Sequence, residues 1–463
     1  MVRRASKAVA VGSACLCAGP AAAFVSRPGA LPAPVSSRST SLRHILKCSL
    51  AEKPAATKTS FNYDDAISPL IAGISPSKTI EVHALTKEME AAGEPVVSLC
   101  VGEPDFAPPA AVIEATAQAA RAGMTKYTGV TGTAPLRAAI CADLLRRKGV
   151  QYEPAEIVVS NGAKQDVFQA VLAVVRPGDE VIIPAPYWPS YPEIVRMAGG
   201  TPVIVDTDVS EGFLLSADAL RAAITPKTRM LIFCNPSNPT GAVHARELCE
   251  ELAAVLREPA ASKVWVLADE IYERIVYDVP HYSFVAIPGM KERTMLINGF
   301  SKSHAMTGYR LGYMAAPLPI VKAVTTIQGQ ITSCASSIGQ AAGLAALGVA
   351  DEEMQLSFDT MRRKRDFVME RLRRIPKINV AEPQGAFYVL PDVSAYYGMH
   401  APDGTLIDGP TPLCLYLLRA HKVALVTGEG FGYFNGVRLS YATSMHDLTL
   451  ALNELEQCLA SLQ

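Results

Sequence analysis

The residues around Lys302 could together hold an aldehyde that carries a phosphate group. Lys302 follows the apolar run Met295–Phe300, Ser301 precedes it directly, and Arg310 lies eight residues further on. An unpaired lysine is costly to bury, so Lys302 either extends its amine to solvent along its apolar stem or takes part in chemistry. An amine can attack an aldehyde, while a hydroxyl and a guanidinium can bind phosphate oxygens. The three side chains therefore make a phosphate-bearing aldehyde a candidate ligand.

Two further motifs could bind a nitrogen-containing ring. Asp269 ends the apolar run Val264–Ala268, and Tyr272 follows three residues later, which returns to the same face if a helical turn begins there. A buried carboxylate can keep a pyridine nitrogen protonated, although an aspartate at this place could instead cap a helix. Asn238, within the run Asn235–Gly241, could donate to an oxygen on the same ring, or the run could be only a rigid turn.

These motifs follow apolar, β-branched runs that predict a parallel sheet covered by helices. The predicted strands are Ile157–Val159, Val181–Ile183, Val203–Val205, Leu231–Cys234, Val264–Ala268 and Met295–Ile297. Most of the intervals between them can hold a crossover helix, such as the amphipathic segment Leu248–Leu256. Ligands of open α/β sheets bind at the carboxyl ends of the strands. Polar clusters at five of these ends therefore predict one shared site.

The pattern along the chain predicts four regions. They are a presequence at residues 1–55, an N-terminal arm with part of a small domain at 56–110, a large domain at 111–350 and a small C-terminal domain at 351–463. Beyond residue 350 a charged helix, Met361–Arg374, and short strands at Phe387–Leu390 and Val437–Tyr441 are typical of an α+β domain. We expect the segment Ser60–Leu99 to pack against this later part.

Composition argues against several classes of function. The 463 residues carry a net charge of −1, so no chain-wide basic field is available to attract nucleic acid. No run after residue 50 reaches the length of a membrane span, so we expect no membrane association of the mature chain. The ten cysteines form no C-x-x-C pair. We interpret them as reduced thiols and expect neither a disulfide framework nor a metal site.

Eight ordered motifs resemble those of the class I/II aminotransferases, which are fold-type I pyridoxal-phosphate enzymes. The motifs are Gly102–Phe106, Lys126–Thr128, Asn161–Gln165, Pro186–Trp188, Asn235–Gly241, Ala268–Tyr272, Gly299–Lys302 with Arg310, and Val437–Tyr441. The resemblance runs from about Ile74 to the C-terminus. It implies an α/β fold with a large, mostly parallel sheet domain and a smaller α+β domain. It also implies pyridoxal 5′-phosphate as the cofactor and a ping-pong exchange of an amine for a ketone.

The resemblance assigns a role to each matching residue. Lys302 resembles the Schiff-base lysine, and Asp269 resembles the partner of the pyridine nitrogen. Tyr272 and Asn238 resemble the donors to the phenolic oxygen, and Trp188 resembles the residue that stacks on the ring. The phosphate site is matched by Gly162, Ala163, Ser301 and Arg310. Tyr127 resembles the tyrosine that reaches the phosphate of the neighbouring subunit, which implies a homodimer with shared sites. From the residue type alone, Trp188 could equally be a core side chain.

Substrate residues follow from the same resemblance. Arg438 resembles the arginine that binds the α-carboxylate, whereas Gly102 matches the position where the backbone approaches that group. An exposed strand arginine is the alternative for Arg438. Thr79 and Lys164 resemble the residues that meet the distal carboxylate in plant and bacterial aspartate/prephenate aminotransferases. Lys164 could instead serve the phosphate or lie on an exposed helix start.

We therefore expect transamination between aspartate or glutamate and a 2-oxo acid, with prephenate as a candidate acceptor. Departures at Gly129, Pro135, Thr427 and Gly430–Gly436 leave the substrate range open. An aromatic or kynurenine aminotransferase or a carbon–sulfur lyase of the same fold is the alternative. An aminotransferase-like DNA-binding regulator is disfavoured, because the N-terminal segment lacks the helical pattern of a winged helix.

Residues 1–50 read as a targeting segment. They contain seven basic residues and no acidic one, which leaves 36 basic against 44 acidic residues in the remainder. An apolar run at 8–18 and the small residues Ala21–Ala23 resemble a secretory signal, and the Ser-, Arg- and Pro-rich stretch 25–47 resembles a transit peptide. The combination resembles the bipartite presequences of plastids with extra membranes. A plain secretory signal or a mitochondrial presequence is the alternative.

Overall fold

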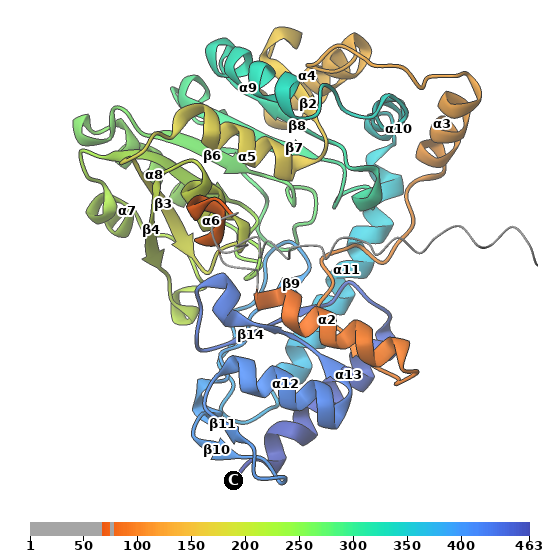
Figure 1. Ribbon diagram of the computed structural model, residues 1–463, viewed down its shortest axis with the longest axis vertical. Coiled ribbons are helices and arrows are strands. Elements are labelled where there is room, and N and C mark those ends of the chain that lie inside the picture. Colours follow the sequence, from red (N-terminus) through yellow and green to blue (C-terminus); the bar gives the residue numbers. More distant parts are fainter. Residues whose placement is uncertain (1–66, 75–77) are drawn as a thin grey trace, which may run out of the picture. The chain divides into compact units, whose positions relative to one another are not determined.

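The computed structural model describes residues 67–74 and 78–463, and Figure 1 shows their arrangement. The presequence predicted at residues 1–55 lies outside the described residues, as does the part of the predicted arm before residue 67. The first described helix, α1 (Pro69–Ala72), is a single turn.

A seven-stranded sheet forms the centre of the larger part of the fold, in the order β2-β8-β7-β6-β5-β3-β4. Its strands are β2 (Ile157–Ser160), β3 (Glu180–Ala185), β4 (Thr201–Asp206), β5 (Thr228–Cys234), β6 (Trp265–Asp269), β7 (Thr294–Gly299) and β8 (Gly312–Ala315). All six predicted strands are present, and the mostly parallel sheet is confirmed. The seventh strand, β8, was not predicted, and it pairs antiparallel with both β2 and β7.

Close packing at the start of β8 explains its sequence. A Cβ on Gly312 would lie 2.4 Å from the backbone nitrogen of Ala163, so this position requires glycine. The strand therefore runs directly beneath the first turn of the helix that begins at Ala163. With four residues and a glycine at its start, β8 carries a weak strand signal in the sequence.

Helices cover both faces of the sheet (Figure 1). They are α3 (Ala110–Arg121), α4 (Ala134–Lys148), α5 (Ala163–Val174), α6 (Ser190–Met197), α7 (Ala217–Ala223), α8 (Arg246–Arg257), α9 (Leu318–Ile331) and α10 (Ser337–Leu347). Alternate residues of a strand face opposite sides: Val181 and Ile183 pack with α5, α6 and α9, whereas Ile182 packs with α7 and α8. Burial on both faces explains the continuous apolar runs. The exception is the edge strand β4, whose residues are exposed or half-buried. The apolar run there therefore did not indicate a strand buried on both faces.

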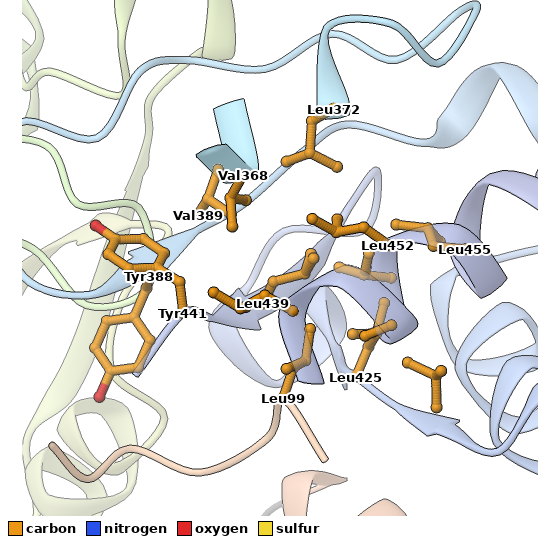
Figure 2. Close-up of a cluster of buried hydrophobic side chains, with 14 of the residues drawn as sticks. Leu99, Val368, Leu372, Tyr388, Val389, Leu425, Leu439, Tyr441, Leu452 and Leu455 are labelled. Carbon is orange, nitrogen blue, oxygen red and sulfur yellow. The ribbon is translucent and has the colours of Figure 1, made fainter. Parts of the chain in front are cut away.

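The remaining elements form a second, smaller assembly around its own core. They are α2 (Lys78–Ala91), β1 (Val97–Ser98), α11 (Asp351–Leu372), β9 (Tyr388–Val389), β10 (Met399–His400), β11 (Leu406–Ile407), α12 (Pro410–His421), β12 (Val423–Ala424), β13 (Val426–Thr427), β14 (Val437–Ser440) and α13 (Met445–Ser461). Figure 2 shows how Leu99, from the early segment, packs among Leu425, Leu439 and Leu452 of the C-terminal part. Strand β1 pairs in parallel with β12. The early segment therefore completes the core of the later one.

Helix α11 begins at Asp351, ten residues before its predicted start at Met361. Its first turns are mostly polar, and Met354 and Phe358 are the only two buried residues there. That stripe is too narrow for the sequence pattern to reveal a helix. In the part of the chain that the structure describes, no helix combines the length and the apolar character of a membrane span.

Candidate active site

A cavity of about 670 Å³ lies at the carboxyl ends of the parallel strands and brings together most of the predicted site residues. The predicted residues that line it are Gly102, Ala163, Lys164, Trp188, Asn238, Asp269, Tyr272, Ser301, Lys302, Arg310 and Arg438. Most of them lie at the carboxyl ends of β2, β3, β5, β6 and β7 or in the segments that follow these strands. Gly102 comes from the loop after β1, and Arg438 from β14 of the smaller assembly. The expected convergence of polar clusters on one site is confirmed.

Lys302 follows the end of β7 and directs its amine to the backbone carbonyl of Gly102. Burial lowers the pKa of Lys302 to about 8. The charge of Glu103 opposes this shift, while those of Arg438 and Arg310 add to it. A lysine with such a pKa has a substantial neutral fraction near neutral pH, which is what a nucleophilic amine requires.

Asp269 is the last residue of β6 and is 5% exposed. Its Oδ2 accepts a hydrogen bond of 2.7 Å from the hydroxyl of Tyr191, and its Oδ1 accepts one of 3.3 Å from the backbone N–H of Ile271. Burial raises the pKa of Asp269, and these two hydrogen bonds oppose the rise. Tyr191 was not predicted as a site residue. The available signal was its position three residues after Trp188, on the same face of a helical turn.

Three side chains form a buried polar cluster beside Asp269. Asn238 Nδ2 donates to the hydroxyl of Tyr272 at 3.5 Å, and this hydroxyl lies 3.0 Å from that of Tyr388. Burial raises the pKa of Tyr272 well above its usual range, so the phenol keeps its proton. Tyr388 was also missed, because a tyrosine inside an apolar strand looks like a core residue.

The turn before α5 forms a cradle with Arg310. Gly162 has a φ of 93°, and a Cβ there would lie 2.6 Å from Nη2 of Arg310. Backbone N–H groups at the start of a helix favour an anion, and Ala163 is the first residue of this helix. Ser301 and Arg310 line the same cavity. The arrangement fits a phosphate group.

Arg438 on β14 is a buried cation without a carboxylate partner among the described residues. It is 7% exposed; Nη2 donates to the carbonyl of Cys100 at 2.7 Å and Nη1 to Oδ1 of Asn238 at 3.2 Å. Its Nε is buried and has no hydrogen-bond partner within the described part of the chain. The guanidinium lies 4.6 Å from the ring centroid of Tyr388. Because an unpaired buried charge is costly, this geometry favours an anionic ligand.

Lys164 and Trp188 lie together at another part of the cavity wall. The amine of Lys164 is 5.1 Å from the centroid of the Trp188 ring. Burial lowers the pKa of Lys164, and the charge of Arg310 lowers it further. Trp188 in turn packs edge-on against Tyr191, with 5.3 Å between ring centroids.

Two predicted residues, Gly162 and Tyr127, do not line this cavity, and a third, Thr79, cannot be placed relative to it. Gly162 lies directly against Arg310, which does line it. Tyr127 is 89% exposed and does not line the cavity of its own chain. Thr79 lies in the first turn of α2, and its side chain is outside the described residues. The roles assigned to Tyr127 and Thr79 stay predictions.

The donor set fits pyridoxal phosphate. It supplies an amine of lowered pKa, a buried carboxylate, two donors beside it and a glycine-lined helix start for a phosphate. Each of these groups has a counterpart on the cofactor. The unpaired Arg438 remains available for a carboxylate of the substrate.

Comparisons with known proteins agree with this reading. Residues 94–455 match the family model described as aminotransferase class I and II. The chain is 46% identical to an aspartate aminotransferase of Pinus pinaster over 86% of this chain and 82% of that protein. It is 45% identical to a bifunctional aspartate aminotransferase and glutamate/aspartate-prephenate aminotransferase of Petunia hybrida, over 86% and 84%.

A solved structure gives the same result for the fold. The aspartate aminotransferase of Rhizobium meliloti superposes with a TM-score of 0.82 at 40% identity, over 86% of this chain and 99% of that one. The predicted fold-type I architecture is confirmed. The chain belongs to the class I and II aminotransferases, a family that implies pyridoxal 5′-phosphate as its cofactor.

Proposed function

We propose that this enzyme transfers the amino group between aspartate or glutamate and a 2-oxo acid such as 2-oxoglutarate or oxaloacetate, and that prephenate is a further acceptor, giving arogenate. This proposal rests on the observation that two cations, Arg438 and Lys164, line one cavity and that neither forms an ion pair with a carboxylate among the described residues. Two such cations suit a substrate with two carboxylates. The names of the plant relatives support the same substrate class.

Lys302 is proposed as the residue that forms the Schiff base with the cofactor and carries the proton at Cα of the substrate. Pyridoxal phosphate, when bound, supplies an electron sink for the bond that breaks at Cα. Asp269 would keep the ring nitrogen of the cofactor protonated, and Asn238 and Tyr272 would donate to the ring oxygen. Gly162, Ala163, Ser301 and Arg310 would hold the phosphate, and Trp188 would cover the ring.

Groups on the smaller assembly and on α5 are proposed to orient the substrate. Arg438 binds the α-carboxylate through parallel hydrogen bonds, which its planar guanidinium favours. The backbone at Gly102 approaches the same group; a Cβ there would lie 2.8 Å from the hydroxyl of Tyr388. Thr79 and Lys164 meet the distal carboxylate.

The active unit is proposed to be a homodimer in which Tyr127 reaches the phosphate of the partner's cofactor. The support is that this tyrosine is 89% exposed and does not line the cavity of its own chain.

We also propose the division into an arm at 56–110, a large domain at 111–350 and a small domain at 351–463. The packing of Leu99 against the C-terminal core supports joining the early segment to the small domain.

Delivery to a plastid by the bipartite presequence, residues 1–55, completes the proposal. Relatives from land plants are consistent with a plant-type enzyme. Fusing residues 1–60 to a fluorescent protein tests the address. Fluorescence in the plastid is expected, and secretion or mitochondrial fluorescence would contradict it.

The decisive experiment for the activity mixes the purified holoenzyme with aspartate alone. A transaminase converts the bound cofactor to its amine form, with a change in absorbance, and returns it on addition of 2-oxoglutarate or prephenate. A carbon–sulfur lyase would release its products without leaving the amine on the cofactor. A preference for aromatic amino acids or kynurenine over aspartate would instead favour the alternative aminotransferases.

A further inference from the structure

Two buried carboxyl groups lie on α5 and β6, two elements that contact each other beside the candidate cavity. Asp269 at the end of β6 is 5% exposed, and Asp166 in the first turn of α5 is fully buried. Burial raises the pKa of Asp166 well above its usual range, and the charge of Asp269 raises it further. Two neighbouring carboxylates do not both ionise readily away from water. The pair is therefore expected to hold one negative charge.

Hydrogen bonds distinguish the two members of the pair. Asp269 accepts from the Tyr191 hydroxyl at 2.7 Å and from the Ile271 N–H at 3.3 Å. Asp166 has only the hydroxyl of Ser160 at its Oδ2, and its Oδ1 is without a partner among the described residues. Donors to the charged form favour ionisation. Asp269 is thus the better place for the charge.

The hydrogen bonds of Ser160 also favour a neutral Asp166. Its hydroxyl oxygen lies 3.2 Å from the carbonyl of Gly162 as well as beside Oδ2 of Asp166. A hydroxyl has a single proton to donate. If that proton goes to the Gly162 carbonyl, Asp166 completes the chain by donating its own proton to Ser160. A neutral Asp166 satisfies both contacts.

We propose that Tyr191 is a positioning residue that keeps the charge of this buried pair on Asp269 and leaves Asp166 a neutral acid. The inference rests on the proposed function in one respect, namely that Asp269 faces the ring nitrogen of the cofactor. Protonation of that nitrogen then depends on Tyr191, which acts on it only through its hydrogen bond to Asp269.

Other titratable groups around Asp269 do not supply this bond. The charge of Lys302 favours ionisation of Asp269, whereas that of Glu270 disfavours it. The Cys234 thiol lies near Asp269, and burial raises its pKa to about 12, so it stays neutral. Tyr191 itself has a pKa well above its usual range because it is buried, which keeps it a donor.

The test is Tyr191→Phe holoenzyme carrying cofactor with an isotope-labelled ring nitrogen, observed by NMR. We expect the ring nitrogen to lose protonation in the variant. Losing a hydrogen bond to a charged group should lower kcat about tenfold to a hundredfold, with a much smaller change in KM. Tyr396→Phe is the matched control, because that buried hydroxyl bonds the carbonyl of Pro376 instead. It should leave both readouts unchanged.

Asp166 gives a second, independent arm. Asp166→Asn retains a neutral donor, so ring protonation should stay at the wild-type level, and adding this change to Tyr191→Phe should restore part of it. Infrared difference spectra of Asp166→Asn against wild type should show the loss of a neutral carboxyl band.

The outcomes separate this inference from the proposed function. A protonated ring nitrogen in Tyr191→Phe, or loss of protonation in Asp166→Asn alone, overturns the proposal for Tyr191. If the ring nitrogen is protonated in wild type and loses its proton in Tyr191→Phe, but the wild-type enzyme does not transaminate aspartate, the proposed function is refuted and the charge assignment stands.

Discussion

At the scale of single residues, the free amine of Lys302 should react with a pH dependence unlike that of an ordinary lysine. Its pKa is lowered to about 8 mainly by burial, so the neutral, nucleophilic fraction of the apoprotein amine rises through about pH 8 and then levels off. Labelling with an acylating reagent, quantified at Lys302 by peptide mass spectrometry between pH 6 and 10, measures this. Exposed Lys227 is the internal control. Glu103→Gln should move the Lys302 curve to lower pH, because the Glu103 charge opposes the shift.

Lys164 tests the substrate class at the same scale. If it meets the distal carboxylate, Lys164→Ala leaves that carboxylate unpaired and costs roughly 1.5–3 kcal/mol, or about tenfold to a hundredfold in kcat/KM for aspartate. A neutral amino acid should be affected much less. Lys322→Ala, at an exposed position outside the cavity, is the control. Equal losses for both substrate classes would show that Lys164 serves the cofactor, and the dicarboxylate proposal would be withdrawn.

At the scale of elements, the turn that starts α5 makes the cofactor site sensitive to one methyl group. Gly162→Ala places a Cβ 2.6 Å from Arg310 Nη2 at a φ of 93°, so the guanidinium must shift from the place where it is proposed to hold the phosphate. We expect cofactor affinity to fall at least about tenfold. Gly289→Ala is the matched control, since Gly289 also has a positive φ of 78° but nothing within 4 Å of its Cβ. That variant should lose about 1 kcal/mol of stability and keep normal cofactor affinity.

The elements also show how far the sequence alone could lead. Long apolar runs ending in polar clusters predicted β2 to β7 and the residues at their carboxyl ends, because a strand buried on both faces leaves a strong local pattern. β8 escaped prediction, since its role depends on packing against Ala163 across 149 positions of sequence. Tyr191 escaped for a similar reason. Its hydrogen bond to Asp269 joins two elements whose contact no local pattern records.

For the molecule as a whole, two buried histidines and the half-buried His281 should make the protein less stable in mild acid. Burial lowers the pKa of His244 and His281 to about 4 and that of His304 to about 3, whereas the unfolded chain titrates near 6.5. Between these values the unfolded state binds more protons, so stability falls as pH decreases from about 6.5 to 4. Each histidine contributes on the order of 1.4 kcal/mol per pH unit.

Urea unfolding at a series of pH values, monitored by circular dichroism, measures this dependence. His244→Gln should flatten the slope by about one histidine's share. His446→Gln, at an exposed position of α13, is the control and should not change it. A midpoint that stays constant from pH 6.5 to 4 would contradict the burial of these rings in the neutral form.

The shared active site is a property of the assembled molecule, and complementation between inactive chains tests it. Tyr127→Phe removes the hydroxyl proposed to act across the interface, and Lys302→Ala removes the amine in its own chain. A heterodimer of the two has one site with both groups and one with neither. If subunits exchange freely in an equal mixture, about a quarter of all sites become intact, and activity should rise well above both parents. The control mixes Lys302→Ala with a chain carrying both changes, which can restore no site. Native mass spectrometry establishes that heterodimers have formed; if they have and activity stays at the level of the parents, Tyr127 does not act in the partner's site.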